Sequence, residues 1–485
     1  MIEPRSPTRP SHYPRRRGSV IVIVIWSIAV MSLVVSALQL FGFRQAVYGR
    51  EVASRVQARW AARAGVENTI AMLISHTEHP VEDDRYAMMH DLEYVAVGEL
   101  LNAGYDIRHH RDGTDWYGPL DEHSRINLHT ASAGDLRNML LSLEDMTEDV
   151  VDSIGDWQDA DDNVSLIGAE SEYYAHLATP YEPRNGPIRS VPELDLVAAV
   201  DEQYLRGEDW NLNNRLDPSE NDGSITWPED DNADDRLRYG WAGFVTVWSA
   251  GNGATESGNP RVRLGLADPD ELAKRIGIDT AKANELINFG LNPSATLDQL
   301  VAAAGNPTAA SSSTGAAQQP PSRSGRSSRS GRSTASTSAG AGSAQQQPVN
   351  LTDKQLAKVF QETMIEGQYT RLPGKINLNT VSVDLLRRIM DALLGDESLA
   401  DEIIYLRNSQ PGGILSIMDL KKIPILASPG AGSTLQRLSE LFTTTSNVFT
   451  ISCKGRSWST GQEVEIIAVV DRSTLPVRIL EYREQ

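Results

Sequence analysis

The sequence predicts an α+β protein in which a long membrane-spanning helix leads into a small antiparallel sheet that carries a large, mainly helical insertion. Three observations predict this fold. An uncharged stretch, residues 19–43, lies near the N-terminus. Short β-prone segments occur in two places, before residue 125 and after residue 440. The chain between them shows mostly helical periodicity.

The composition excludes some classes of function. The 485 residues carry a formal net charge of −20, with 65 Asp and Glu against 45 Lys and Arg. This balance argues against broad electrostatic binding of nucleic acid, because both partners would be negative. The single cysteine, Cys453, excludes an intramolecular disulfide and a cysteine metal cluster. We expect it to be a small buried strand residue rather than a nucleophile.

The N-terminal region predicts a membrane anchor. Residues 1–18 form a basic leader with five arginines and one glutamate, and the uncharged residues 19–43 follow. At 1.5 Å per residue this stretch exceeds the roughly 30 Å of a bilayer core. The arginines predict that their flank stays cytoplasmic and that the remaining chain is exported. A cleaved secretory signal is the alternative, but its apolar region is normally about 7–15 residues long.

The helical pattern does not stop at the membrane edge. Ala, Val and Arg continue at helical spacing, so we expect one helix over residues 19–75, about 85 Å long. Residues 76–124 then form the first part of a sheet domain, with a hairpin that turns at Asp112-Gly113. Residues 441–485 complete the sheet with three strands, since alternating Val, Ile and Thr are separated by two turns.

Three segments of the insertion share one form: 125–140, 261–276 and 374–389. Each has a short apolar stretch, then an N-cap signal and an amphipathic helix. The N-cap signal is a threonine in the first and third segments and Asp268-Pro269 in the second. These segments resemble helix-hairpin-helix units, which are best known for binding the DNA backbone.

The hairpin turns themselves favour a structural use of the motif. Carboxylates occupy the first turn, 144–149, and the third, 394–397, where they would repel phosphate. A membrane-tethered DNA receptor of a competence or pilus system is the alternative. We assign the α-domain to residues 125–306 and 351–440, and residues 307–350 to a low-complexity linker rich in Ser, Gly, Ala and Gln.

One acidic stretch, residues 209–220, has the spacing of a calcium-binding loop of the EF-hand type. Oxygen-bearing side chains fall at positions one, three, five, nine and twelve, and position seven offers its carbonyl group. Asn214 stands at position six, where glycine is usual, and tolerates a positive φ. The predicted ligands are Asp209, Asn211, Asn213, Arg215, Asp217 and Glu220.

A second acidic stretch, 144–172, contains Asp159, Asp161 and Asp162. Paired carboxylates can perform acid–base chemistry in a membrane-anchored hydrolase, but nothing in the sequence places a substrate pocket beside them. Walker, HExxH, nucleophile-elbow and Rossmann motifs are absent from the sequence. We therefore expect a protein that is not an enzyme.

A basic leader that ends in Gly18 before an uninterrupted apolar helix resembles the class III signal of type IV pilins and pseudopilins. Within that superfamily the chain resembles the protein K family of type II secretion systems. The resemblance rests on the order of these motifs: Ala64–Glu67, Asp156-Trp157, Asp159–Asp162, Gly168–Glu170, Tyr173-Tyr174, Pro180-Tyr181, Asn185–Pro187, Ser190–Leu194, Lys375–Thr380 and Val469–Asp471.

The resemblance implies a minor pseudopilin of the bacterial inner membrane, with a cytoplasmic N-terminus and a periplasmic domain. Prepilin peptidase would cut between Gly18 and Ser19. Partners would be other minor pseudopilins, the major pseudopilin and the inner-membrane secretion platform. Family members bind calcium, which fits the acidic loop. Major pilins carry Glu at the fifth mature position, where this chain has Ile23, and a subunit without that Glu suits the filament tip.

Overall fold

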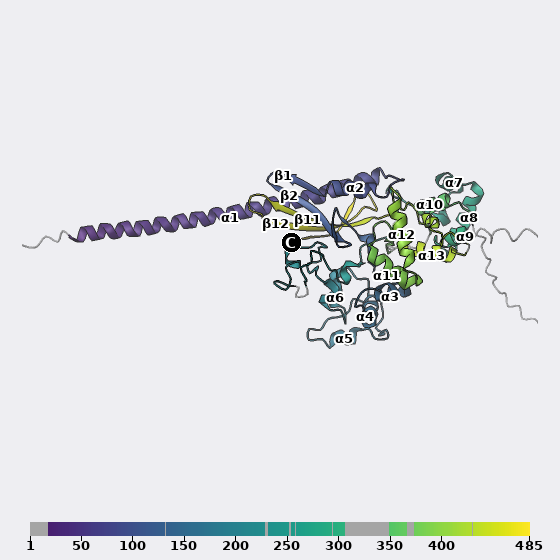
Figure 1. The fold of residues 1–485 in the computed structure, drawn as a ribbon, viewed down its shortest axis with the longest axis horizontal. Helices are drawn as coiled ribbons and strands as arrows, with labels where there is room; N and C mark the ends of the chain where they lie inside the picture. The colour runs from purple at the N-terminus through teal and green to yellow at the C-terminus, as the bar shows by residue number, and fades with distance from the viewer. Residues whose placement is uncertain are drawn as a thin grey trace, which may run out of the picture.

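The computed structural model describes residues 18–130, 132–227, 231–251, 254–257, 259–292, 294–305, 349–365, 373–428 and 430–485. Nearly all of the predicted leader and linker therefore lies outside the described residues. Figure 1 shows one long helix that projects from a body made of a sheet and a group of helices.

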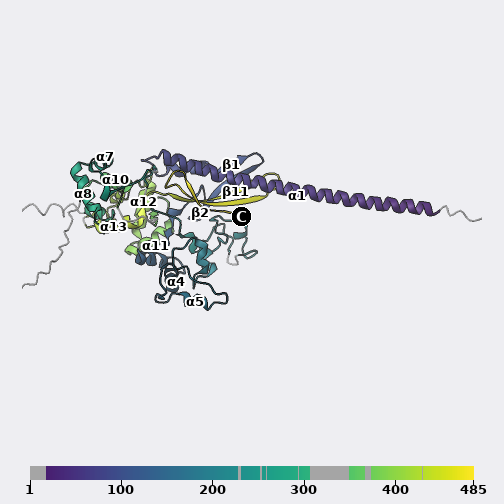
Figure 2. The same cartoon turned by 180° about the vertical axis from the view of Figure 1, so that it is seen from behind.

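The projecting helix, α1, runs without a break from Gly18 to Glu78, which confirms the continuous helix predicted from the sequence. Its N-terminal half is exposed from Val20 to Phe43. By length and composition it is the one helix among the described residues that could cross a membrane, with a mean hydropathy of 2.7 over its most apolar window. Its C-terminal half packs on the sheet (Figure 2).

The sheet joins the two ends of the chain. Its path runs β1-β2-β11-β12-β13, and all of its pairs are antiparallel. The strands before the insertion are β1 (Val97–Leu100), β2 (Ala103–Arg111), β3 (Thr114–Tyr117) and β4 (Leu120–Asp121). Those after it are β11 (Val448–Ser457), β12 (Glu463–Asp471) and β13 (Arg478–Glu484). The predicted hairpin and the three C-terminal strands are thus confirmed.

The sheet domain has its own hydrophobic core between α1 and one face of the sheet. Ala61, Ala62 and Leu73 of α1 are buried against Ile451 and Cys453 of β11. Cys453 is fully buried, as expected, and burial raises the pKa of its thiol, which keeps it unreactive. Helix α2 (Ala87–Tyr94) lies between α1 and β1 in the chain and closes this core.

The insertion is helical and has a second, separate core. Its helices are α3 (Ala133–Leu141), α4 (Glu148–Gln158), α5 (Ser171–Ala175), α6 (Glu202–Arg206), α7 (Pro269–Ile276), α8 (Thr280–Gly290), α9 (Gln299–Gly305), α10 (Asp353–Glu362), α11 (Val383–Leu394), α12 (Ser398–Ser409) and α13 (Gly432–Leu441). Short 3-10 turns connect them, among them η1 (Glu122–Ser124) and η3 (Pro218–Glu220).

Three two-residue parallel strand pairs divide the insertion into similar units. β5 (Ile126–Asn127) pairs with β6 (Val245–Thr246), β7 (Val262–Arg263) with β8 (Thr363–Met364), and β9 (Ile376–Asn377) with β10 (Phe442–Thr443). The first strand of each pair belongs to one of the three segments that share a form in the sequence. Each segment therefore begins a unit whose start and end are joined by one of these short parallel strand pairs.

The N-caps of these units partly differ from the prediction. Asp268 caps α7, as expected, but α3 and α11 are capped by Ser132 and Ser382 rather than by the preceding threonines. The reason is a turn before each helix. The amide of Thr130 donates to the Asn127 carbonyl oxygen, and Thr380 makes the same bond in the third unit. The backbone is thus already turned at the threonine, and the helix starts after the serine.

Candidate metal centres

The loop predicted to bind calcium, residues 209–220, follows α6 and ends with η3, and it packs on the face of the sheet opposite α1. Its side chains are largely buried: Asp209, Asn213 and Glu220 are each no more than 2% exposed. The structure therefore brings the first, fifth and twelfth residues of the predicted loop into the interior. Asn214, the sixth residue, has a φ of 60°, the left-handed conformation expected for that position.

Backbone amides hold the loop closed. Asp209 accepts hydrogen bonds from the amides of Asn213 and Asn214, at 3.0 Å each. The side-chain oxygen of Asn211 accepts from the Asn213 amide, and Glu220 accepts from the Trp210 amide at 3.0 Å. These bonds close the loop on itself, but the three loop carboxylates do not form one of the groups of described residues whose ligand oxygens all lie within 4.8 Å of one another.

Two residues of the loop tie it to the sheet. Asp217 forms an ion pair with Lys454 of β11 at 2.5 Å. Arg215, predicted to offer only its carbonyl oxygen, places its guanidinium against Asp106 of β2 at 2.6 Å. Asp217, the predicted ligand at position nine of the loop, therefore also contacts the sheet. The loop in this way connects the α-domain to the sheet domain.

Burial disfavours the ionised form of two carboxylates in the loop. Burial raises the pKa of Asp209 to about 7. Burial, together with the nearby charge of Asp209, raises the pKa of Glu220 to about 8. Burial also acts on Asp217, but the hydrogen bond and charge of Lys454 outweigh it and hold the pKa of this carboxyl below its usual value. Among the residues described, neither Asp209 nor Glu220 forms a direct ion pair, although the charges of Arg125 and Arg483 partly offset the effect of burial on Asp209.

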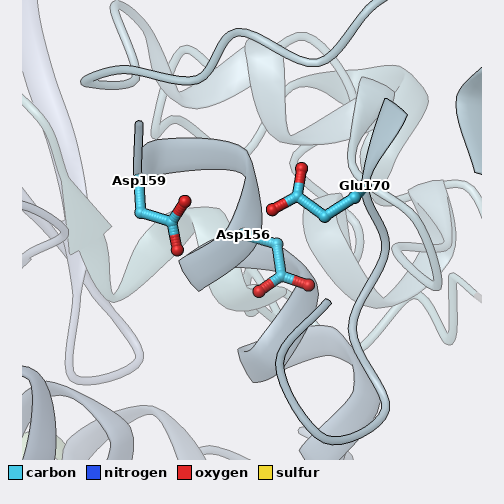
Figure 3. Close-up of side chains that lie close together, drawn as sticks. All are labelled: Asp156, Asp159 and Glu170. Atoms are coloured by element: carbon cyan, nitrogen blue, oxygen red, sulfur yellow. The ribbon is translucent and has the colours of Figure 1, made fainter. Parts of the chain in front are cut away.

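A second group of carboxylates was missed as a unit by the sequence analysis. Asp156 and Asp159 lie at the C-terminal end of α4, and Glu170 precedes α5. Ligand oxygens of the three residues all lie within 4.8 Å of one another. Figure 3 shows the three carboxylates gathered at the end of one helix.

The most buried member of this group is incompletely satisfied. Glu170 is 2% exposed, and neither of its carboxylate oxygens has a hydrogen-bond partner in the described part of the chain. Burial, with added repulsion from Asp156 and Asp159, raises the pKa of Glu170 to about 7. Asp156 is also buried, and both of its oxygens accept from the Ser165 amide, at 3.1 and 3.2 Å. The Glu170 carboxylate, buried and with two oxygens that lack a hydrogen-bond donor among the described residues, fits a hard cation that prefers oxygen ligands.

The loop that carries Glu170 closes tightly over α4. A methyl group at Gly168 would overlap the carboxylate of Asp156, so glycine is needed at this position. Beside the centre, Trp157 packs edge to face on Tyr174 and Tyr181, and the two tyrosine rings are tilted to each other, with ring centroids 5.3 to 6.4 Å apart. The motifs at 156–157, 159–162, 168–170, 173–174 and 180–181, which contribute to the family resemblance, thus lie together in the fold.

The signal for this centre is present in the sequence. Asp156 and Asp159 are three residues apart on one helix face, and Glu170 follows the glycine that allows the close approach. The sequence analysis instead grouped Asp159 with Asp161 and Asp162. In the structure the Asp161 carboxylate accepts a hydrogen bond from the Asn163 amide, and the Asp162 carboxylate accepts one from the Ser171 hydroxyl. Both carboxylates therefore have hydrogen-bond partners close by in the chain.

Two other features predicted from the sequence lie within residues that the structure describes. Gly18 and Ser19, the predicted cleavage site, form the first residues of α1. The turn between α7 and α8 contains Gly277 with a φ of 78°, as a helical hairpin needs. The carboxylate of Asp279 caps α8 there by accepting from the Lys282 amide at 2.8 Å. A phosphate approaching this helix end would meet a carboxylate, which favours structural use of the hairpin.

The architecture defines a class: a protein with one long N-terminal helix, apolar in its first half, that packs on an antiparallel sheet, and an acidic α-domain inserted between the strands. Residues 124–207 match the family model described as type II secretion system (T2SS), protein K. These residues include the second carboxylate group and its aromatic neighbours. The predicted resemblance is thus confirmed over residues 124–207, which match the protein K family of type II secretion systems.

Two similar proteins extend the comparison. The chain is 24% identical over 200 residues to the type II secretion system protein K of Pectobacterium carotovorum subsp. carotovorum, which covers 40% of this chain and 61% of the relative. The chain thus matches about three fifths of that relative's length. It is also similar to a chain in the crystal structure of the GspK-GspI-GspJ complex from the enterotoxigenic Escherichia coli type 2 secretion system, with a TM-score of 0.45, 11% identity and coverage of 91% of this chain and 99% of that one.

Proposed function

We propose that this chain is a minor pseudopilin of a type II secretion system, which helps to initiate or limit growth of the pseudopilus during export of folded proteins across the outer membrane. The proposal rests on one observation: residues 124–207, which match the protein K family model, are inserted into a sheet that packs on the long helix α1. An exposed apolar half of α1 suits a membrane, and later the interior of a helical filament. Its packed half fixes the sheet domain to that anchor.

The start of α1 supports a place at the filament tip. Ser19 and Ile23 stand where major pilins usually have Phe or Met as the first residue and Glu at the fifth position. That Glu neutralises the terminal amine of a neighbouring subunit, and a buried amine without a counter-charge is costly. A subunit without the Glu suits the position ahead of which no further subunit sits.

The same helix gives the topology. The basic leader keeps the N-terminus in the cytoplasm, α1 crosses the inner membrane once, and the sheet and α-domain lie in the periplasm. Prepilin peptidase cuts between Gly18 and Ser19. Gly18→Ala should block this cut, whereas Gly42→Ala, in the same helix with no atom within 4 Å of the added methyl group, should not. N-terminal sequencing of the purified chains distinguishes these outcomes.

We further propose that both carboxylate groups hold calcium. Asp209, Asn211, Asn213 and Glu220, with the Arg215 carbonyl oxygen and Asp217, would hold one ion, and Asp156, Asp159 and Glu170 the other. The ion supplies positive charge to carboxylates that burial otherwise disfavours. It would thereby fix the loop that joins the α-domain to the sheet.

A pull-down from cells that express the secretion genes tests the main proposal. The tagged full-length chain should recover other minor pseudopilins after mild detergent extraction. Recovery of none of them, from membranes in which they are present, would contradict it. If purified protein instead retarded DNA in a salt-sensitive manner, the DNA-receptor alternative would be favoured.

A further inference from the structure

One end of the sheet faces the direction from which α1 emerges. The turn between β11 and β12 contacts α1 there: the Arg50 guanidinium donates to the Ser459 carbonyl oxygen at 2.6 Å, and the Ser54 and Ser459 hydroxyls are 2.8 Å apart. The Trp458 amide donates to the Asn102 carbonyl oxygen at 2.9 Å, which joins the turn between β1 and β2 to the same end. Figures 1 and 2 show this end of the sheet beside the projecting half of α1.

Large apolar side chains are exposed on both turns. Leu101 is 94% exposed and Trp458 is 57% exposed. Trp458 lies over Gly104, where a methyl group would overlap its ring, so its indole is held in place although much of it faces outward. Folding gains little from apolar groups in such positions, and side by side they form a small hydrophobic tip.

Positive charge surrounds this tip. Residues 44–63 of α1 contain five arginines and one glutamate, a net charge of +4. Arg44 and Arg55 are exposed. Two acidic groups at this end are paired, Glu484 with Arg59 at 2.9 Å and Glu463 with Arg456 at 3.7 Å, whereas Glu51 and the exposed Glu99 of β1 oppose the arginines. Trp and Arg beside an apolar span are typical of a membrane–water interface.

The length of the helix sets the height of the tip above the membrane. Arg50 follows Phe43, the last residue of the uncharged stretch, by seven residues, so the β11–β12 turn lies about 10 Å beyond it along α1. The headgroup layer adds roughly 5–8 Å to each side of the hydrocarbon core. An average helix tilt of about 20° brings one side of the domain closer still.

We propose that this end of the sheet docks on an anionic phospholipid surface, with Leu101 and Trp458 among the headgroups and the arginines of α1 facing the phosphates. The inference rests on the proposed insertion of α1 into a membrane. Docking holds the sheet domain upright on its anchor before the chain leaves the bilayer. The arginines supply the preference for anionic lipid.

Headgroup quenching of a fluorescent probe tests this docking. Leu101→Cys is labelled in the full chain, in nanodiscs of phosphatidylglycerol and phosphatidylethanolamine that contain a headgroup nitroxide lipid. The natural Cys453 is fully buried and does not compete for the label. The matched control is Leu166→Cys, another leucine with positive φ that is 84% exposed but lies beside the second carboxylate group.

The probe at 101 should be quenched strongly and the probe at 166 weakly. Arg44→Gln and Arg55→Gln should each lower the ratio of docked to undocked domain about fivefold, and pure phosphatidylcholine should do so further. Equal quenching at 101 and 166 would overturn the docking. So would a probe at 101 that is untouched by lipid and is shielded only when other minor pseudopilins are added.

A third probe separates this proposal from the membrane anchor itself. Leu40→Cys lies in the uncharged stretch and reports insertion through quenching by acyl-chain nitroxides. Quenching at 40 without quenching at 101 overturns the docking and leaves the anchor intact. Absence of quenching at both positions overturns the proposed membrane insertion and, with it, the docking.

Discussion

Gly455 of β11 lies directly under Ala58 of α1. A methyl group at Gly455 would overlap the Ala58 carbonyl oxygen and the Ala62 amide, so helix and strand approach each other backbone to backbone. Gly65 allows a second close approach, to Cys453 and Tyr105. Small residues thus fix the position of the long helix on the sheet, and with it the position of the whole domain relative to its anchor.

Gly455→Ala should lower the free energy of unfolding by about 1–3 kcal/mol, because the helix must move away from the strand. Chemical unfolding of the full chain in detergent, followed by circular dichroism, measures this change. Gly134→Ala is the matched control, since nothing lies within 4 Å of its added methyl group. It lies in α3 and should be neutral or stabilising by up to about 1 kcal/mol. Equal effects of the two substitutions would contradict the close approach.

The local elements of the fold could be predicted from the sequence because each has its own periodicity or turn signal. The hairpin at Asp112-Gly113 is an example, with φ values of 50° and 74° at its two turn residues. The pairing of β2 with β11 has no local signal, since the whole insertion separates Ile107 from its partner Cys453 in the chain. The two-residue strands that close the three units are too short to show a period at all.

The two carboxylate groups differ for the same reason. The loop at 209–220 is contiguous, so its spacing alone placed Asp209 and Glu220 together. The second group takes its members from the end of α4 and from the chain before α5, so its geometry depends on how the connecting loop closes. The ion pair between Lys454 and Asp217 also could not be predicted from the sequence, because it joins the sheet to the α-domain.

Glu220→Gln should change stability in opposite directions with and without calcium. In a chelator the substitution removes a buried carboxylate whose pKa is about 8, so the melting temperature should rise or stay unchanged. In excess calcium the wild type gains binding energy that the variant lacks, so the variant should melt at the lower temperature. A purely structural Glu220 would instead lower the melting temperature equally under both conditions.

Without calcium, stability should fall as the pH rises from about 4 to about 8. Asp209 and Glu220 have pKa values of about 7 and about 8 in the folded chain, against 3.8 and 4.5 as ordinary values. The folded chain therefore retains protons that the unfolded chain has already released, and this difference favours unfolding as the pH increases. Asp217, with a lowered pKa, contributes the opposite trend only at lower pH.

Melting temperatures at pH 5 and pH 8, with a chelator and with calcium, measure this dependence. Calcium binds the ionised carboxylates, so it should raise the melting temperature at pH 8 far more than at pH 5. Glu220→Gln should remove part of the pH dependence in the chelator, since Asp209 and Glu170, with pKa values of about 7, retain their own contributions. A calcium effect of the same size at both values of pH would be inconsistent with these buried groups as ligands.

Glu170→Gln should abolish one class of calcium sites and leave the other. Glu170 is buried, both of its oxygens lack a partner among the described residues, and it faces Asp156 and Asp159. Replacing one oxygen by an amide removes a charge from a three-carboxylate centre, and calcium affinity depends on that charge. Isothermal titration should therefore show two ions per wild-type chain and one per variant chain. Glu172→Gln makes the same chemical change on the exposed side of α5 and should retain both ions. If the two variants bound calcium alike, Glu170 would not be a ligand. Its buried carboxyl, which has a raised pKa, would then be kept neutral by protonation instead.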